Sequence, residues 1–242
     1  MSKPDDSRKH HHSSPAKTLT AGAVALAVLT VLPDKAVAVD SFAVQSALTS
    51  YAHIFSIMAI TGCLVAERLL IQTDMSKEDE DIVNKIDFVY GLVAALLIGS
   101  GFARAIHFGK GGEFYTHEIL FWVKMTLSGI WGGLSIFPTI IFRQLKAGEA
   151  PPLTDALVAR LRSIINAELS AIWTIPVLAS LMSFGVGFSP EFPWQIGAVV
   201  SILATVGSFW YYAKQALNWS EQKEDSREDK TKTSENTFAI GK

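Results

Sequence analysis

His53 is the ionisable residue of this sequence whose position is most informative. It lies within an apolar stretch, with small and apolar residues on both sides. A neutral imidazole binds haem iron, copper or zinc, and it also donates and accepts protons. A buried histidine can equally serve as a hydrogen-bonding link between helices. The sequence therefore leaves three roles open for His53: a structural bond, a metal or haem ligand, and a proton carrier.

Further ionisable residues cluster near one end of the apolar stretches. Charged side chains within a membrane span are costly, and they usually face the bundle interior or a polar cavity. His107 and His117 are candidates for a second haem ligand. Arg104 and Lys124 are candidates for binding a haem propionate, another anion or a lipid phosphate. With His53 as a metal ligand, this set forms the predicted cofactor-binding site: His53, Arg104, His107, His117 and Lys124.

A second set of ionisable residues lies near the opposite end of the stretches. We expect structural polar pairs here, with Glu67 paired to Arg68 or Arg143 and Glu168 paired to a basic residue of the loop after the third helix. Such pairs offset the cost of placing charge at membrane depth. The predicted members of this set are Glu67, Arg68, Asp87, Arg143 and Glu168.

Motifs of soluble enzymes are missing from the sequence. It contains no glycine-rich phosphate loop, no HExxH, no CxxC and no nucleophile elbow. The single cysteine, Cys63, excludes an intrachain disulfide. The net charge of -2 gives no basic excess for nucleic acid. Catalytic residues stay unknown, and haem is the candidate cofactor.

Composition and charge distribution predict the elements that position these residues. The chain is 49% hydrophobic and 18% charged, which is less charged than the roughly 25% of an average soluble domain. Its charges are segregated, and the apolar stretches between them approach the roughly 20 residues that span a bilayer. The sequence therefore predicts an all-α, polytopic transmembrane helical bundle. The charge-rich segments are 1–17, 74–87, 143–162 and 214–242.

The chain divides into a leader, a core, an added helix and a tail. Residues 1–38 have a polar start, a short apolar run and a small-residue site, which is typical of a signal peptide or a thylakoid-transfer segment. Residues 44–188 form the predicted four-helix membrane core. Residues 193–217 form an additional transmembrane helix, and residues 218–242 form a charged tail that we expect to be disordered.

Start signals and glycines refine the predicted helices. Ser76 and Asp79 form a capping-box pattern ahead of the second helix, and Thr154 is a cap ahead of the fourth. Gly129 and Gly133 are spaced for close helix packing. The predicted spans are Val44–Ile71, Ile86–His107, Phe114–Phe142, Ala167–Phe184 and Trp194–Leu217.

Lysine and arginine are concentrated in alternate connections. The loops after the first and third helices and the C-terminal tail are rich in basic residues, and the other connections hold few. The positive-inside rule then places the tail in the cytoplasm or stroma and the mature N-terminus in the periplasm or lumen. We therefore expect an integral protein of a thylakoid or a bacterial inner membrane.

From about Ser46 to Phe188 the sequence resembles the bacterial and plastid family of predicted membrane proteins known as a domain of unknown function, number twenty-two fourteen. Polar residues at membrane depth match the family pattern as well as the apolar background does. His53 and Glu67 match its first helix, and LMSFGVGF near Leu181 matches the close of its fourth. Further matching residues are Asp87, Gly91, Gly101, Arg104, Lys110, Gly111, Tyr115, Phe121, Trp122, Lys124, Pro138, Thr139 and Arg143.

This resemblance implies a four-helix bundle but brings no activity. More distantly, the chain is similar to four-helix membrane protoporphyrinogen oxidases and copper-resistance membrane proteins, whose bundle histidines are thought to serve haem or metal. Similarity of fold is a weak guide to function. The fifth helix and the tail lie outside the family pattern, which suggests an anchor or a docking element.

Three functions remain open on the sequence. The first is a non-enzymatic subunit or assembly factor of a membrane complex, for example a photosynthetic one, which agrees with the short loops and the lack of catalytic motifs. The second is a haem- or metal-binding membrane redox protein with His53 as ligand. The third, transport of a small anion, lacks a continuous polar path across the apolar middle. The lipid bilayer and subunits of a complex are the expected partners.

Overall fold

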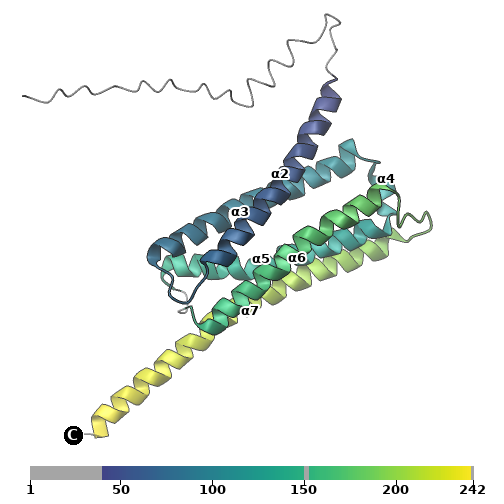
Figure 1. The fold of residues 1–242 in the computed structure, drawn as a ribbon. Helices are drawn as coiled ribbons and strands as arrows, with labels where there is room; N and C mark the ends of the chain where they lie inside the picture. Colours follow the sequence, from purple (N-terminus) through teal and green to yellow (C-terminus); the bar gives the residue numbers. More distant parts are fainter. Residues whose placement is uncertain (1–39, 150–152, 241–242) are drawn as a thin grey trace, which may run out of the picture. The chain divides into compact units, whose positions relative to one another are not determined.

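The computed structural model describes the backbone of residues 40–149 and 153–240 and the side chains as far as Trp219. The leader predicted for residues 1–38 lies outside the described residues. The described chain is helical, and short turns join its helices (Figure 1). The elements are α2 (Ser41–Leu70), α3 (Lys77–Ala103), the π-helical turn η1 (Arg104–Phe108), α4 (Gly112–Thr116), α5 (Ile119–Ala147), α6 (Asp155–Ser183) and α7 (Trp194–Ile240).

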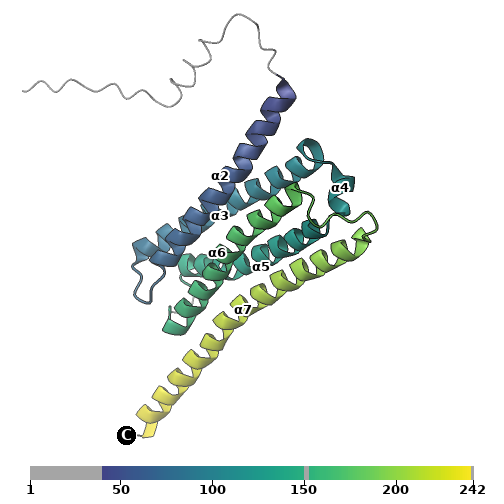
Figure 2. The ribbon, with the colours of Figure 1, turned by 45° about the vertical axis from the view of Figure 1, so that its right-hand side comes forward.

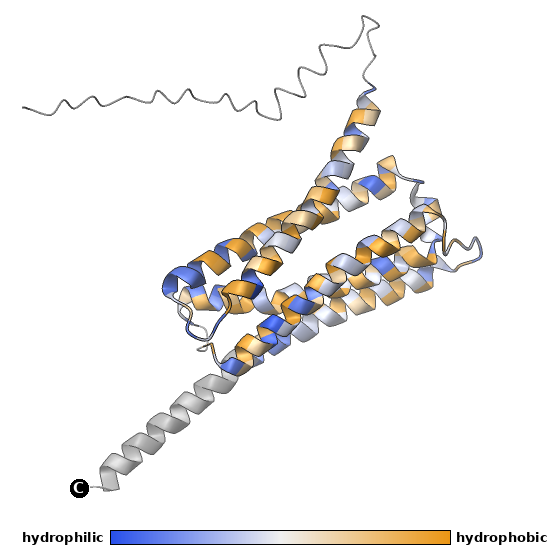
Figure 3. Cartoon of the chain, viewed as in Figure 1, coloured by the Kyte–Doolittle hydropathy of each residue, from blue (hydrophilic) through white to orange (hydrophobic). Residues whose placement is uncertain are grey.

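Within the described residues, 5 helical segments are long and apolar enough to cross a membrane. The strongest hydrophilic colours gather at the α2–α3 turn and at the beginning of α6, whereas apolar residues cover much of the helices between (Figure 3). Large apolar side chains such as Met58, Trp173 and Leu203 are exposed. Lipid is the solvent that such a surface requires. The prediction of an all-α transmembrane protein is thus confirmed.

Both predicted helix caps are present. The Ser76 hydroxyl accepts a hydrogen bond from the Asp79 amide over 3.1 Å, and the Asp79 carboxylate accepts one from the Ser76 amide over 3.3 Å. The Thr154 hydroxyl accepts from the Leu157 amide over 3.3 Å. Each cap satisfies amide groups that the first turn of a helix leaves unpaired.

Helices α2, α3, α5 and α6 contact one another around an apolar core. α2 packs against α3 and α6, and α5 packs against α3 and α6. Ile60 and Leu64 of α2, Phe137 of α5 and Leu161 of α6 belong to the same fully buried cluster. This arrangement agrees with the predicted four-helix core and places the polar residues of all four helices on facing sides.

α7 runs along α5 with very close backbone contact (Figure 2). A Cβ atom at Gly129 or Gly133 would overlap Thr205 or Ser208 of α7. Small residues allow such an approach, which gives van der Waals contact that lipid cannot replace. The Thr126 and Ser201 hydroxyls add a hydrogen bond of 2.9 Å. The fifth helix is therefore packed into the bundle through the glycines of α5.

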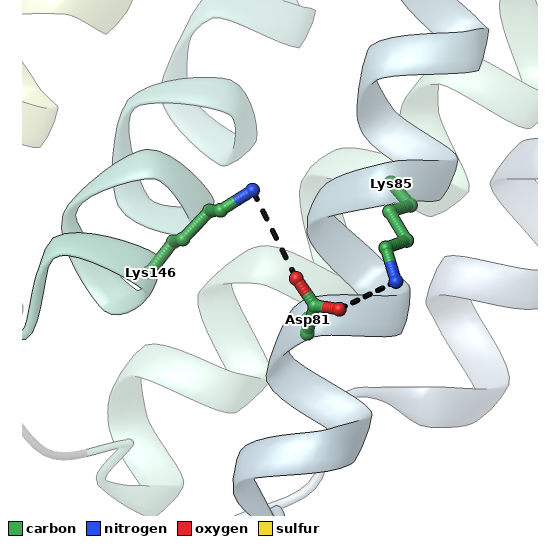
Figure 4. Close-up of polar contacts among 3 residues, drawn as sticks. All are labelled: Asp81, Lys85 and Lys146. Atoms are coloured by element: carbon green, nitrogen blue, oxygen red, sulfur yellow. Dashed lines mark ion pairs between the residues drawn. The ribbon is translucent and has the colours of Figure 1, made fainter.

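An ion-pair group joins α3 and α5 near the beginning of one helix and the end of the other. Asp81 lies between Lys85 of its own helix, at 2.6 Å, and Lys146 of α5, at 3.8 Å (Figure 4). All three side chains are well exposed. Exposed pairs of this kind contribute little to stability because water screens the charges.

One predicted span differs from the structure. The third span, expected from Phe114 to Phe142, is interrupted after α4, because Glu118 has an extended backbone and forms a bridge with Phe188. The backbone of α7 continues as a helix to Ile240, and disorder of the tail stays a prediction. Residues 218–240 contain neither glycine nor proline, so the sequence there provides no helix-ending signal.

Candidate functional site

The His53 ring is fixed between α2 and α3. Its Nδ1 lies 3.2 Å from the Leu97 carbonyl oxygen and 3.1 Å from the Ser100 hydroxyl. Because a carbonyl oxygen only accepts, the Nδ1–H of His53 is the donor in the first of these bonds. In a neutral ring the lone pair is then on Nε2. This is the tautomer in which Nε2 can bind a metal, accept a proton or accept a hydrogen bond.

Two cationic side chains lie within electrostatic range of His53. Lys124 of α5 and Arg104 of η1 both act on the imidazole, and Arg104 also acts on Lys124. Lys124 is half-buried, whereas Arg104 is exposed. No ion pair links either cation to a carboxylate of the described residues. We call His53, Arg104 and Lys124 the His53 cluster, and its positive charge is uncompensated within the described part of the chain.

Local backbone geometry brings the His53 cluster together. Arg104 begins a π-helical turn, a departure from the α-helix that is frequent at functional sites. Gly101, one turn earlier, lies against the His53 ring, and a Cβ there would stand 3.2 Å from Cε1. A larger residue at position 101 would therefore push the ring or the helix away.

The other two predicted histidines are not brought to His53 by any contact of the described residues. His107 is exposed, and its ring lies beside that of Phe108. The Nδ1 of His117 donates to the Glu113 carbonyl oxygen over 2.9 Å, within the turn before α5. The described residues hold no group of three or more histidine, cysteine or acidic residues arranged for a metal. Haem ligation by His107 or His117 therefore stays a prediction.

Two loops close this end of the bundle. The Ile119 amide donates to the Gly187 carbonyl over 3.0 Å, and the Phe114 and Phe188 rings stack with centroids 4.9 Å apart. Glu118 is fully buried under this contact. Burial raises the pKa of the Glu118 carboxyl, while the Leu120 backbone and the Lys110 charge act in the opposite direction.

A second polar group, which we call the Glu67 cluster, lies deep in the bundle. It joins α2, α3, α5 and α6 and consists of Glu67, Asp87, Tyr90, Thr139 and Glu168. The Tyr90 hydroxyl donates to Glu168 over 2.9 Å, and the Thr139 hydroxyl donates to Asp87 over 2.7 Å. Glu67 lies within electrostatic range of Asp87 and Glu168. Along α2, Glu67 is about 21 Å from His53 at 1.5 Å per residue, so the two clusters are separate.

The ion pairs expected for the acidic residues are not formed among the described residues. Arg68 donates instead to Asn166 over 3.1 Å, because neighbouring residues point about 100° apart around a helix and Arg68 cannot share the inward direction of Glu67. The basic residues expected to pair with Glu168 lie in the first turns of α6 instead, where Arg160 donates to Gln215 and Arg162 to the Ile71 carbonyl.

The hydroxyl donors of the Glu67 cluster were absent from the predicted site. Tyr90 donates to Glu168, for which a basic partner was expected, and Thr139 donates to Asp87, for which no partner was named. The sequence did offer one signal for a hydroxyl donor: Tyr90 lies one turn after Asp87 on the same helix. Its contact with Glu168 of α6, however, depends on how α3 and α6 face each other.

These observations define a class of protein: a polytopic helical membrane protein with a cationic cluster that no carboxylate of the described residues pairs with, and a separate buried acidic cluster. The chain belongs to the family described as "Predicted membrane protein (DUF2214)", whose family model matches residues 45–187. The match covers α2 to α6 and ends before α7. No curated protein matches the chain, and no solved structure matches it.

Proposed function

We propose that this protein binds an anionic ligand at the His53 cluster. The observation that carries the proposal is that Lys124 and Arg104 lie within electrostatic range of each other and of His53, with no described carboxylate paired to either cation. Two like charges repel each other, and the repulsion is stronger where a side chain is half-buried. An anion placed between them turns this repulsion into attraction.

The chemistry of the cluster favours a ligand with negatively charged oxygens on an amphiphilic body. Arg104 offers a planar fork for phosphate or carboxylate, and Lys124 offers a point charge deeper in the bundle. The flanking residues of α2 and α3, such as Ile54 and Phe102, are apolar and exposed. A lipid phosphate and a haem propionate share this chemistry.

These residues meet part of the binding requirements of haem. His53 would provide one axial ligand through Nε2, and Arg104 with Lys124 would hold the propionates. Bound haem would supply one-electron redox chemistry. The predicted second axial ligand, His107 or His117, makes no described contact with the His53 cluster. We therefore place haem second to a phosphate-bearing ligand.

Native mass spectrometry of the full chain in nanodiscs containing an anionic phospholipid tests this proposal. Arg104→Gln and Lys124→Gln should each weaken retention of the anionic lipid about tenfold, because a hydrogen bond to a charged group contributes about 1.5–3 kcal/mol. Lys77→Gln, an exposed lysine distant from the cluster in α3, is the matched control. Equal retention in all variants would refute the site.

An absorption spectrum of the same preparation separates the two ligand sources. A Soret band that is lost in His53→Ala but kept in His117→Ala would identify haem with His53 as ligand. Lipid retention without a Soret band would identify the phosphate. Neither signal in protein purified from its native membrane would count against anion binding altogether.

A role as a subunit or assembly factor of a membrane complex, for example a photosynthetic one, is the second candidate. It is favoured by a line of small exposed residues on α3: Gly91, Ala95 and Gly99. A Cβ at Gly91 or Gly99 would meet no atom within 4 Å. Spacing by four residues is the pattern that lets another transmembrane helix approach closely. Gly99→Leu should release a bound partner on a native gel, whereas Gly62→Leu on α2 should not.

We also propose the orientation that the basic loops indicate, with the C-terminal tail on the cytoplasmic or stromal side. It is supported by the charge asymmetry of the loops. In a Cys63→Ala background, a cysteine at Ser234 should react with an impermeant maleimide only after the membrane is opened. A cysteine at Lys110 should react in sealed vesicles of native orientation. The reverse pattern would overturn the orientation.

A further inference from the structure

The Glu67 cluster brings three carboxyl groups from three helices into the interior of the bundle. Glu67 of α2 is 2% exposed, Asp87 of α3 is 6% exposed and Glu168 of α6 is 1% exposed. Burying a carboxylate is expensive unless a cation or several hydrogen bonds compensate for the lost water. What compensates each group therefore determines what the cluster can bind.

Hydrogen bonds compensate two of the three carboxyl groups. Asp87 accepts from Thr139, and Glu168 accepts from Tyr90. Glu67 Oε1 is buried and has no hydrogen-bond partner among the described residues. A carboxyl group that must stay buried without a partner is more stable as the neutral acid.

An unpaired donor lies next to the same cluster. Trp131 of α5 is 4% exposed, and its Nε1–H has no acceptor among the described residues. Its ring meets the Tyr90 ring edge-on, with centroids 6.0 Å apart. Buried polar groups without partners are uncommon in folded proteins. Here the Glu67 cluster contains one, Glu67 Oε1, and Trp131 Nε1 next to the cluster is another. Such groups indicate a site that exchanges hydrogen-bond partners or protons.

The charges that face Glu67 are mostly of the same sign. Cys63 precedes it on α2, Asp87 and Tyr90 face it from α3, and Glu168 faces it from α6. The cation within range is Arg143 of α5, which acts on Asp87 and is itself exposed. No ion pair joins any of the three carboxyl groups to a lysine or arginine of the described chain. One exposed guanidinium cannot balance three buried negative charges.

We infer that the Glu67 cluster is a proton-binding site, in which Glu67 carries an exchangeable proton and the Tyr90–Glu168 and Asp87–Thr139 bonds hold the neighbouring carboxyl groups in place. The ligand is a proton rather than a metal, because the described residues show no set of ligating groups positioned around a common ion. This site is separate from the His53 cluster and does not rest on anion binding.

Labelling with dicyclohexylcarbodiimide in proteoliposomes of the full chain tests the inference. The reagent enters lipid and reacts with protonated carboxyl groups. The carboxyl oxygen adds to the central carbon of the carbodiimide, its proton passes to a nitrogen, and rearrangement leaves a stable N-acylurea of unchanged total composition. Mass spectrometry should locate this adduct on Glu67 at neutral pH and show its loss as the pH rises.

Two variants and an internal control make the outcome decisive. Glu67→Gln should remove the adduct, and Glu78, an exposed glutamate at the start of α3, should stay unlabelled as an internal control. Tyr90→Phe should increase labelling of Glu168 several-fold, because that carboxylate loses its donor. A change in thermal stability alone, with the labelling profile unaltered, would indicate that Tyr90 is only structural.

Absence of the Glu67 adduct at every pH, in protein whose circular dichroism is native, would overturn the inference. Protection of Glu67 by sodium or calcium ions at constant pH would also overturn it, because the site would then bind a metal cation. Equal lipid retention in wild type and Arg104→Gln would refute anion binding and leave the labelling of Glu67 unaffected, so failure of the anion proposal and failure of this one are distinguishable.

Discussion

The His53 ring on α2 lies against Gly101 on α3, where a Cβ would stand 3.2 Å from the ring atom Cε1. The hydrogen bond from His53 to the Leu97 carbonyl is formed one turn earlier on the same helix. The imidazole is therefore bonded to α3 through the Leu97 carbonyl and packed closely against the same helix, where glycine at position 101 leaves room for the ring. Gly101 sets the position of the ring that faces Arg104 and Lys124.

Gly101→Ala should displace the ring by a few tenths of an ångström and weaken anion retention several-fold. Replacing glycine by alanine inside a helix normally stabilises it by about 0.5–1 kcal/mol. At position 101 the crowding should cancel this gain. Gly99→Ala, where a Cβ meets nothing within 4 Å, is the matched control and should raise the unfolding temperature. Equal behaviour of the two variants would show that the contact with His53 is unimportant.

Gly133→Ala should destabilise the packing of α7 on α5. The added methyl group would overlap the Ser208 side chain and approach its backbone carbonyl carbon at 2.9 Å. Overpacking of this kind costs about 1–3 kcal/mol. Thermal unfolding in detergent measures it, with Gly62→Ala as the control because a Cβ there meets no neighbour. An unchanged midpoint for Gly133→Ala would mean that α7 moves aside freely.

Glu118→Gln should stabilise the protein at neutral pH and leave it unchanged in acid. Burial raises the pKa of Glu118 in the folded chain above its ordinary value of 4.5. Below pH 4.5 the carboxyl is protonated in both folded and unfolded chains, so it carries no penalty. As the pH rises toward the raised value, the unfolded chain loses the proton first, and the wild-type protein loses stability.

Unfolding temperatures of the wild-type and Glu118→Gln proteins across this pH range measure the effect. The difference between them should grow with pH and level off above the raised pKa. Glu113→Gln, in the exposed turn before Glu118, should show no such growth. A constant difference across the range would contradict a titrating Glu118.

Ser76→Ala should destabilise the start of α3 by about 1 kcal/mol, the usual cost of losing an N-cap. The Ser76 hydroxyl accepts from the Asp79 amide, and alanine leaves that amide to water. Ser76→Thr should restore most of the stability because threonine retains the hydroxyl. Faster amide exchange of residues 77–80 in the alanine variant alone would locate the loss at this cap.

The sequence by itself determined the solvent, the spans and the separation of the polar residues into two groups. Segregated charges and apolar stretches of sufficient length fix these features, because a bilayer admits few structures other than helices with internally bonded backbones. Ser76 and Thr154 were identifiable as caps because capping is local. A cap bonds to an amide two or three residues away and needs no distant partner.

The tertiary structure alone decided which polar groups meet. The positions of Tyr90 and Glu168 in the sequence do not say how α3 and α6 are rotated toward each other. Their hydrogen bond therefore could not be predicted. The interruption of the third span at Glu118 depends on Phe188, seventy residues later, for the same reason. Local patterns fix where a helix runs, whereas the rotation of each helix against its neighbours is set by packing. That rotation places His53 within electrostatic range of Arg104 and Lys124, and Glu67 within range of Asp87 and Glu168.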